Sequence, residues 1–184
     1  LAIDYTKWTD LLFDHTSGVG CPLMAMAHTF EECLTWPGLR PKDGPGGAED
    51  MAKAKQLMID AGYPDGFKTK YDVRQVGTYP DQCTVVKQQL KDALGIDGEM
   101  TTYPSAAGYA LFGTSREEGS DGDWEMACQG EGQVVLDVDG IMGGVYRKGA
   151  TRNYTDWQSD KVDAWFEQQK VEQDPAKRIA INKE

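Results

Sequence analysis

The sequence predicts an α/β fold, in which a mostly parallel sheet is flanked by helices. From Asp50 onward, segments with apolar side chains at helical spacing alternate with short strand-like segments, in the order helix, strand, helix, strand, helix, strand, loop, helix. Such alternation is typical of parallel strands that are joined by helices. In addition, 184 residues with 40% hydrophobic side chains are enough to bury a core.

Both ends of the chain have helical patterns. Apolar side chains at positions 1, 5, 8, 11 and 12 share one helical face, and no capping residue precedes them. Asp174 and Pro175 are typical of a helix start, and the pattern then runs to Asn182 without a glycine stop. We therefore expect a piece of a longer protein, without its signal peptide. The alternative is a complete small domain with frayed ends.

A long loop is expected at residues 16–48, which are rich in glycine and proline and show no periodicity. It either packs as a functional element or covers another part of the protein. The regular part then begins with a helix at 50–61, which Gly62 ends, and a tight turn at 63–66.

A strand follows at 67–74, where apolar and charged residues alternate as in a half-exposed strand. Residues 129–159 show no regular pattern. The remaining elements that we expect are a helix at 80–94 ended by Gly95, strands at 96–103 and 124–128, and helices at 106–112, 160–172 and 176–182.

The charge of the chain excludes some classes of partner. It carries 19 basic and 30 acidic side chains, which give a formal net charge of −11. No basic cluster is present, and a face that binds duplex nucleic acid needs one. The sequence contains no run of about 18 apolar residues, the pattern that would indicate a membrane-spanning helix. We interpret the acidity mainly as a solvated surface that repels anionic partners.

Motifs of catalysis and metal binding are missing. There is no GxSxG, P-loop or HExxH pattern, so the sequence indicates no enzyme. The acidic turns at 121–123 and 137–140 lack the further ligands of a calcium loop, and His15 and His28 lack zinc spacing. We expect neither a metal nor a cofactor. Cys21, which lies between the two histidines, leaves a small thiol-dependent enzyme as one alternative; a stand-alone α/β interaction domain is the other.

Six motifs stand in one order along the chain. They are AID at 2–4, AKAKQLMIDAGYPDGF at 52–67, YPD with QQL and LGI between 79 and 96, DWEM at 123–126, RNY at 152–154 with Trp157 and VD at 162–163, and DPAKR at 174–178. In this order they resemble the extracellular solute-binding proteins of family 5, which include the dipeptide, oligopeptide and nickel receptors of ABC importers.

The resemblance implies a type II periplasmic-binding-protein-like lobe, with residues 1–184 as a single incomplete lobe of a two-lobed protein. It implies that a small-molecule or peptide-like solute is captured between the lobes and delivered to ABC permease subunits in the membrane. It also implies a bacterial or archaeal protein that is periplasmic or extracellular and is either free or anchored as a lipoprotein. This protein is expected to be a monomer and to bind no nucleic acid.

The resemblance places the ligand at strand ends and in the loops between lobes, in agreement with the crevice rule for open α/β sheets. The strand at 124–128 runs into Gln129 and Gly130 where the family has Gly-Trp, which departs from a standard peptide site. The acidic residues that come after this strand could bind an ammonium group of the ligand, because charge-assisted hydrogen bonds are strong. The expected ligand-binding residues are Gln129, Gly130, Glu131, Asp137, Asp139, Arg152 and Asn153. The alternatives are a plain loop residue at Glu131, an Asx turn at 137–140 and a loop anchor at Asn153.

The four cysteines allow three pairings. Cys83 lies on the apolar face of a helix and Cys128 lies inside a strand, so we interpret both as buried thiols. Cys21 and Cys33 share the long loop and are the favoured disulfide, which an exported protein permits.

Overall fold

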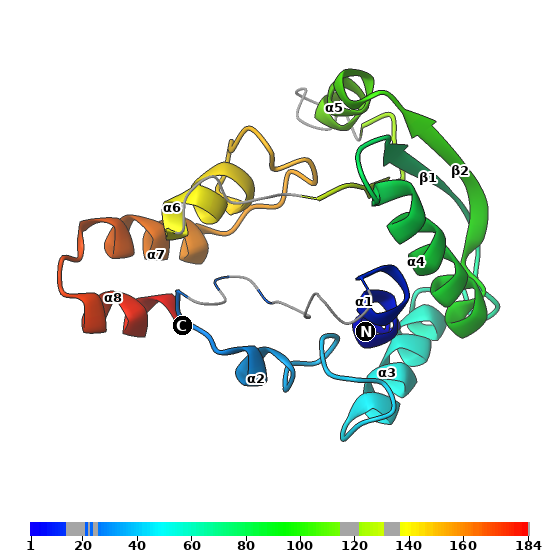
Figure 1. The fold of residues 1–184 in the computed structure, drawn as a ribbon, viewed down its shortest axis with the longest axis horizontal. Coiled ribbons are helices and arrows are strands. Elements are labelled where there is room, and N and C mark those ends of the chain that lie inside the picture. Colours follow the sequence, from blue (N-terminus) through cyan, green and yellow to red (C-terminus); the bar gives the residue numbers. More distant parts are fainter. Residues whose placement is uncertain (14–20, 22, 24–25, 115–121, 131–136, 184) are drawn as a thin grey trace. The chain divides into compact units, whose positions relative to one another are not determined.

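The computed structural model describes residues 1–13, 21, 23, 26–114, 122–130 and 137–183. The chain separates into two compact units (Figure 1). The first unit comprises Leu1–Cys21, Phe30–Gly108 and Trp124–Gln129, and the second comprises Pro22–Thr29, Tyr109–Asp123 and Gly130–Glu184. The expectation that all 184 residues form one lobe stays a prediction.

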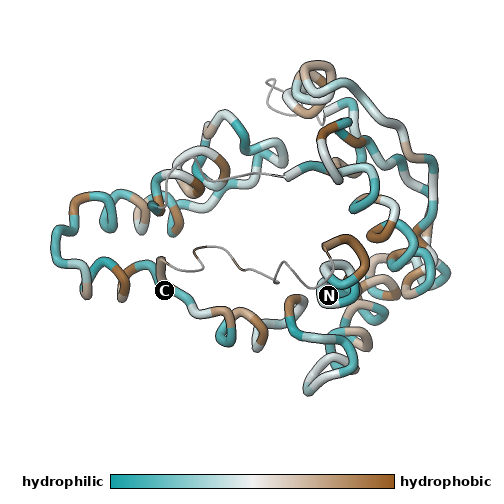
Figure 2. Tube along the Cα trace, in the orientation of Figure 1, coloured by the Kyte–Doolittle hydropathy of each residue, from teal (hydrophilic) through white to brown (hydrophobic). Residues whose placement is uncertain are grey.

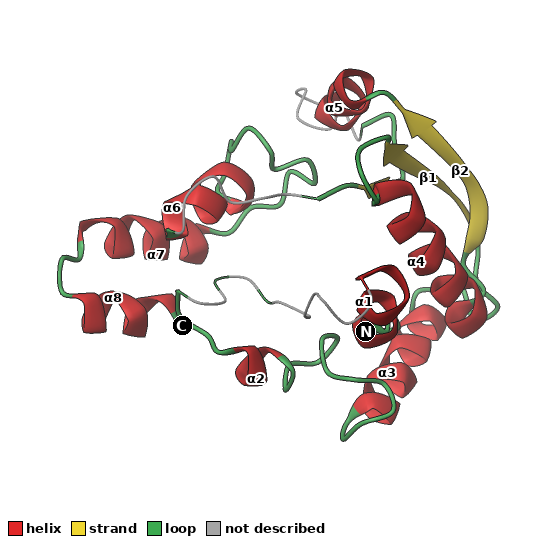
Figure 3. Ribbon diagram, in the orientation of Figure 1, coloured by secondary structure: helices red, strands yellow, loops and turns green. Residues whose placement is uncertain are grey.

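The sheet of the first unit is parallel, which confirms the predicted fold class. β1 (Lys68–Arg74) pairs in parallel with β2 (Asp97–Tyr103) and with β3 (Met126–Cys128), in the order β2-β1-β3. Figure 3 shows β1 and β2 running side by side. Because β1 is central, its two faces decide what the sheet buries.

One face of β1 forms the core of the first unit. Tyr71 and Val73 are fully buried, and the Tyr71 hydroxyl donates to the Ile96 carbonyl at 3.4 Å. Helix α4 (Tyr79–Leu94) packs on this face, and helices α1 (Tyr5–Phe13) and α3 (Gly47–Asp60) pack on α4. Figure 2 shows that these helices contain both apolar and polar residues. The buried core residues are Ala2, Ala54, Tyr71, Val73, Cys83, Leu90 and Ile96.

The helix ends follow local capping rules. Gly95 ends α4, as predicted; it has the left-handed conformation, with φ 70°, and its N–H donates to the Lys91 carbonyl. The first helix begins at Tyr5 rather than at Leu1, so the expectation of an uncapped start is wrong. The physical reason is Asp4, whose side chain accepts from the Lys7 N–H at 3.2 Å and caps the helix.

A buried carboxylate ties down the described part of the long loop. In it, α2 (Phe30–Cys33) precedes a run of turns that leads to α3. Asp50 of α3 accepts from the Gly38 N–H and from the Arg40 guanidinium, both at 2.7 Å, and from the Lys42 ammonium at 3.3 Å. The Arg40 hydrogen bond holds the pKa of Asp50 well below its usual range. The loop therefore packs around one ionised group that is 2% exposed.

Short helices build the second unit. α6 (Val138–Ile141) continues into the π-helical turn η2 (Met142–Tyr146), and α7 (Asp160–Val171) precedes α8 (Pro175–Asn182). Residues of α5 (Ser105–Gly113) fall in both units. The buried residues of the main cluster are Leu23, Val138, Met142 and Phe166. The expectation of irregular structure over 129–159 is wrong for 138–146, because burial of Val138 and Met142 orders a segment with no long periodic pattern.

Two disulfides link the first unit. Cys21 pairs with Cys33, as predicted. Cys83 of α4 pairs with Cys128 of β3, so the interpretation of these two residues as buried thiols is wrong. Both side chains do turn inward, but the sequence alone does not show that the helix face and the strand meet. Among the described residues, no helix is long and apolar enough to cross a membrane.

We expect acid to weaken the first unit through Asp50. A carboxyl whose pKa is lower in the folded state stabilises the fold above its unfolded pKa of about 4 and loses this contribution as the pH falls below it. D50N should lower the free energy of unfolding at pH 7 by about 3 kcal/mol, because Arg40 and Lys42 lose their partner. Urea unfolding between pH 3 and 7 measures both effects. D43N, at an exposed position of the same loop, is the control; equal losses in the two variants would contradict this account.

The two disulfides should differ in their effect on stability. The Cys83–Cys128 pair spans 45 residues and the Cys21–Cys33 pair spans 12. Loop-closure entropy predicts losses of about 4 kcal/mol for C83A/C128A and about 3 kcal/mol for C21A/C33A. Chemical unfolding of the two double variants measures the order. Alkylation of the denatured, unreduced chain should find no free thiol, and labelling of Cys83 or Cys128 would refute the second pair.

Candidate functional site

The three strands of the first unit end at one edge of the sheet. β1 ends at Arg74, β2 ends at Tyr103, and β3 ends at Cys128, directly before Gln129. Open α/β sheets bind ligands beyond the carboxyl ends of their strands, because the loops that leave the strands form a crevice there. A ligand site is therefore expected at this edge.

Arg74 organises this edge. Its side chain is 5% exposed and donates to the Ser105 hydroxyl at 2.9 Å and to the Gln129 side-chain oxygen at 3.2 Å. Its guanidinium carbon lies 5.8 Å from the centroid of the Tyr79 ring. A Cβ at Gly108 would stand 2.5 Å from the Arg74 Cγ, so only glycine lets α5 approach so closely. One side chain thus joins the ends of β1 and β3 to the first turn of α5.

A second buried charge lies beside Arg74. Asp72 is 4% exposed and accepts from the Tyr103 hydroxyl at 3.0 Å, and this hydrogen bond raises the pKa of Tyr103. Asp72 and Arg74 share the face of β1 opposite to Tyr71. We call Asp72, Arg74, Tyr103, Ser105 and Gln129 the carboxyl-edge cluster. The expectation of a half-exposed strand is wrong at this end of β1, because the cluster itself covers the second face.

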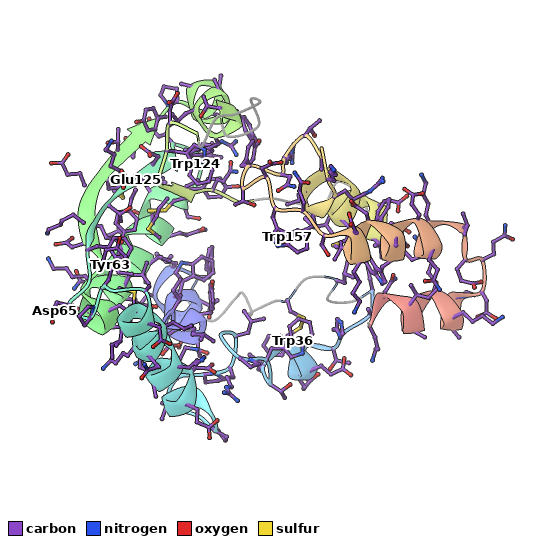
Figure 4. The ribbon with its side chains drawn as sticks, turned by 180° about the vertical axis from the view of Figure 1, so that it is seen from behind. Trp36, Tyr63, Asp65, Trp124, Glu125 and Trp157 are labelled. Atoms are coloured by element: carbon purple, nitrogen blue, oxygen red, sulfur yellow. A yellow bond between two sulfur atoms is a disulfide. The ribbon has the colours of Figure 1, made fainter. Side chains whose placement is uncertain are left out.

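The structure places Gln129, a predicted site residue, in the carboxyl-edge cluster. Gly130 follows it, is half-buried, and counts with the second unit. Glu131 lies outside the described residues. Trp124 and Glu125, labelled in Figure 4, precede β3 at the opposite edge. The Glu125 carboxylate accepts from the Thr69 hydroxyl and from the Lys70 N–H, and these bonds lower the pKa of Glu125.

The predicted carboxylates of the second unit form a network of their own. Asp137 accepts two hydrogen bonds from the Arg178 guanidinium, at 2.8 and 2.9 Å, and caps α6 by accepting from the Asp139 N–H. The Arg178 bond lowers the pKa of Asp137. Asp139 accepts from Gln169, which is fully buried and in turn accepts from Arg178. The network anchors α6 to α7 and α8, and the ligand role of the two aspartates stays a prediction.

Asn153 also has an anchoring role. It is 4% exposed; its amide nitrogen donates to the Trp157 and Arg147 carbonyls, and its oxygen accepts from the Trp157 N–H. These bonds shape the loop before α7, where Trp157 is 47% exposed (Figure 4). Arg152 is half-buried, and its N–H donates to the Gly144 carbonyl. The geometry thus agrees with the loop-anchor alternative for Asn153.

The second unit also holds a pocket of about 530 Å³, next to the network. Its lining combines the Asp137–Arg178 pair with apolar side chains such as Ile179. Sequence reasoning missed Arg178, Gln169, Arg74 and Asp72. The first two belong to helices without a site motif, and the last two read as the exposed half of an alternating strand.

We expect Arg178 to stabilise the second unit. R178A removes the two guanidinium hydrogen bonds of Asp137 and the Arg178 donor of the buried Gln169 oxygen, which should cost about 2 kcal/mol of local stability. Hydrogen exchange of α7 and α8, read by mass spectrometry, measures this loss. K177A, at the exposed neighbouring position, is the control. Equal protection in the two variants would show that the network does not hold these helices.

Comparison with known proteins identifies the family of the chain. The family model of the bacterial extracellular solute-binding proteins, family 5 Middle, matches residues 1–153. No curated protein matches the chain.

Solved structures share the fold. AppA of Clostridium difficile is 21% identical, with a TM-score of 0.75, over 99% of this chain and 35% of that one. DppA of Helicobacter pylori, in complex with the peptide STSA, is 20% identical, with a TM-score of 0.72, over 98% and 33%. NikA of Staphylococcus aureus, in complex with Ni(L-His)2, is 15% identical, with a TM-score of 0.73, over 98% and 36%.

The chain therefore spans about a third of the length of these structures. The likeness shows a fold of the type II periplasmic-binding-protein kind, as the motifs of the sequence imply. Since the family model covers well over half of its residues, the chain belongs to family 5 of the bacterial extracellular solute-binding proteins.

Proposed function

We propose that the chain belongs to the solute-capturing component of an ABC importer, which holds a small peptide-like or other solute and delivers it to permease subunits in the membrane. The observation that carries the proposal is the family match over residues 1–153, which includes all three strands and the carboxyl-edge cluster. The protein acts outside the cytoplasm, in the periplasm or at the cell surface, as a monomer that is either free or anchored by a lipid.

The chemistry of the carboxyl-edge cluster supports binding rather than catalysis. Ser105, its only hydroxyl on an aliphatic side chain, accepts a hydrogen bond from Arg74. A guanidinium has no acceptor and stays protonated, so it cannot activate the hydroxyl as a general base. Amide, hydroxyl and guanidinium groups are instead well suited to orient a polar solute by hydrogen bonds.

A peptide-like solute fits these groups. A peptide carries backbone carbonyls and a carboxylate, which accept hydrogen bonds from amide and guanidinium donors. DppA of Helicobacter pylori was solved with a peptide, whereas NikA of Staphylococcus aureus was solved with a nickel–histidine complex. The ligand roles predicted for Glu131, Asp137, Asp139, Arg152 and Asn153 stay predictions, since Arg178 already pairs with Asp137 and the loop before α7 already uses the Asn153 amide. The net charge of −11 agrees with a protein that has no nucleic-acid partner.

Titration of the 15N-labelled chain tests this proposal. We expect trialanine to bind weakly, with a Kd of about 1 mM, which corresponds to about −4 kcal/mol. The shifted backbone amides should gather at Arg74, Gln129 and Gly130, where the strands end. Ni(L-His)2 and maltotriose serve as alternative solutes. If none of the three moves these signals, or if all shifts map to the amino edge around Glu125, the proposed function is wrong.

A further inference from the structure

Arg74 constrains the chemistry that Gln129 offers. The guanidinium of arginine carries five N–H donors and no acceptor. Whichever end of the Gln129 carboxamide faces Arg74 must therefore be the oxygen, and the structure has this arrangement, with the Nη1 of Arg74 3.2 Å from the Oε1 of Gln129. The amide NH2 group then points away from Arg74. Among the described residues it has no hydrogen-bond partner.

The position of Arg74 is itself fixed on several sides. Its second terminal nitrogen donates to Ser105, its aliphatic stem lies against Gly108, and its backbone pairs with Tyr103 of β2. Because of these contacts, the Arg74 guanidinium cannot move to accommodate a rotation of the Gln129 carboxamide. The carboxamide of Gln129 must adapt to Arg74, and not the reverse.

The backbone beneath Gln129 is held as well. β3 pairs with β1 only from Met126 to Cys128, but the Cys83–Cys128 disulfide binds its last residue to α4. Gln129 is the next residue, so its Cα has little freedom. The disulfide fixes where the side chain starts, and Arg74 fixes which way its amide turns.

We propose that Arg74 is a positioning residue that orients Gln129, so that position 129 presents N–H donors and selects solute groups that accept hydrogen bonds, such as a peptide carbonyl or a carboxylate. The inference rests on the proposed function for the presence of a solute. The orientation of the amide rests on the geometry of Arg74 alone. The two parts can therefore be tested separately.

Side-chain NMR of Gln129 tests the orientation without any solute. In R74Q, the partner at position 74 both donates and accepts, so the amide loses its single orientation and its NH2 signals should shift and broaden. K70Q removes one positive charge from the same strand, at an exposed side chain, and should leave these signals unchanged. Unchanged Gln129 signals in a folded R74Q chain would overturn the inference, whether or not any solute binds.

Trialanine binding tests the selection of acceptors. Loss of one oriented hydrogen bond, worth about 1.4 kcal/mol, should raise the Kd about tenfold in R74Q and in Q129A. The double variant should lose no more than either single variant, because both act through the same amide. Additive losses, or an unchanged Kd in R74Q, would overturn the inference. If the wild-type chain binds no solute, the proposed function fails instead, and the NMR result still decides the orientation.

Q129E covers the case in which R74Q does not fold. A carboxylate at 129 pairs with Arg74 more strongly than an amide does, but it has no N–H donor to offer. We expect Q129E to keep or raise the thermal midpoint and still to weaken trialanine binding about tenfold, the effect of one lost hydrogen bond. Unweakened binding in Q129E would show that the solute does not accept a hydrogen bond at this position.

Discussion

A buried guanidinium at the end of the central strand is the constraint on which the candidate site depends. Removing a charge from water is costly unless hydrogen bonds replace the lost hydration. The two terminal nitrogens of Arg74 find hydrogen-bond acceptors in two other segments, Ser105 at the start of α5 and Gln129 after β3. The need to satisfy one side chain therefore draws three separate stretches of the chain into one arrangement.

Helix α4 has the matching role on the other face of the sheet. Tyr71 and Val73 are fully buried beneath it, and Cys83 joins it covalently to β3. This link matters because β3 is only three residues long, and so short a strand gains little from backbone pairing. The apolar face of β1 forms the buried core that stabilises the first unit, and the opposite face carries Asp72 and Arg74 of the carboxyl-edge cluster.

Much of the secondary structure could be predicted because its signals are local. The helices at 50–61, 80–94 and 160–172 carry apolar residues at helical spacing, and Gly62 and Gly95 mark two of the ends. The parallel sheet followed from the order of these elements. Helix α6 and the π-helical turn were missed, because packing against Phe166, 20 or more residues away, orders them rather than any periodic pattern of their own.

The site was less accessible to sequence reasoning, for the same physical reason. The resemblance to the family led to Gln129, but the burial of Arg74 depends on Ser105 and Gln129, which lie 31 and 55 positions away. Asp137 reads as a free carboxylate in the sequence, whereas in the structure Arg178, 41 positions away, accounts for its charge. The role of such a charged residue cannot be predicted from the sequence until the partner that neutralises its charge is known.

We propose that solute is held at the carboxyl edge of the first unit, against the Gln129 amide that Arg74 orients. Intermolecular nuclear Overhauser effects between trialanine and the chain test this most directly. The account predicts contacts between the trialanine methyl groups and the Gln129 NH2 protons. Contacts confined to the pocket of the second unit, around Asp137 and Ile179, would contradict it.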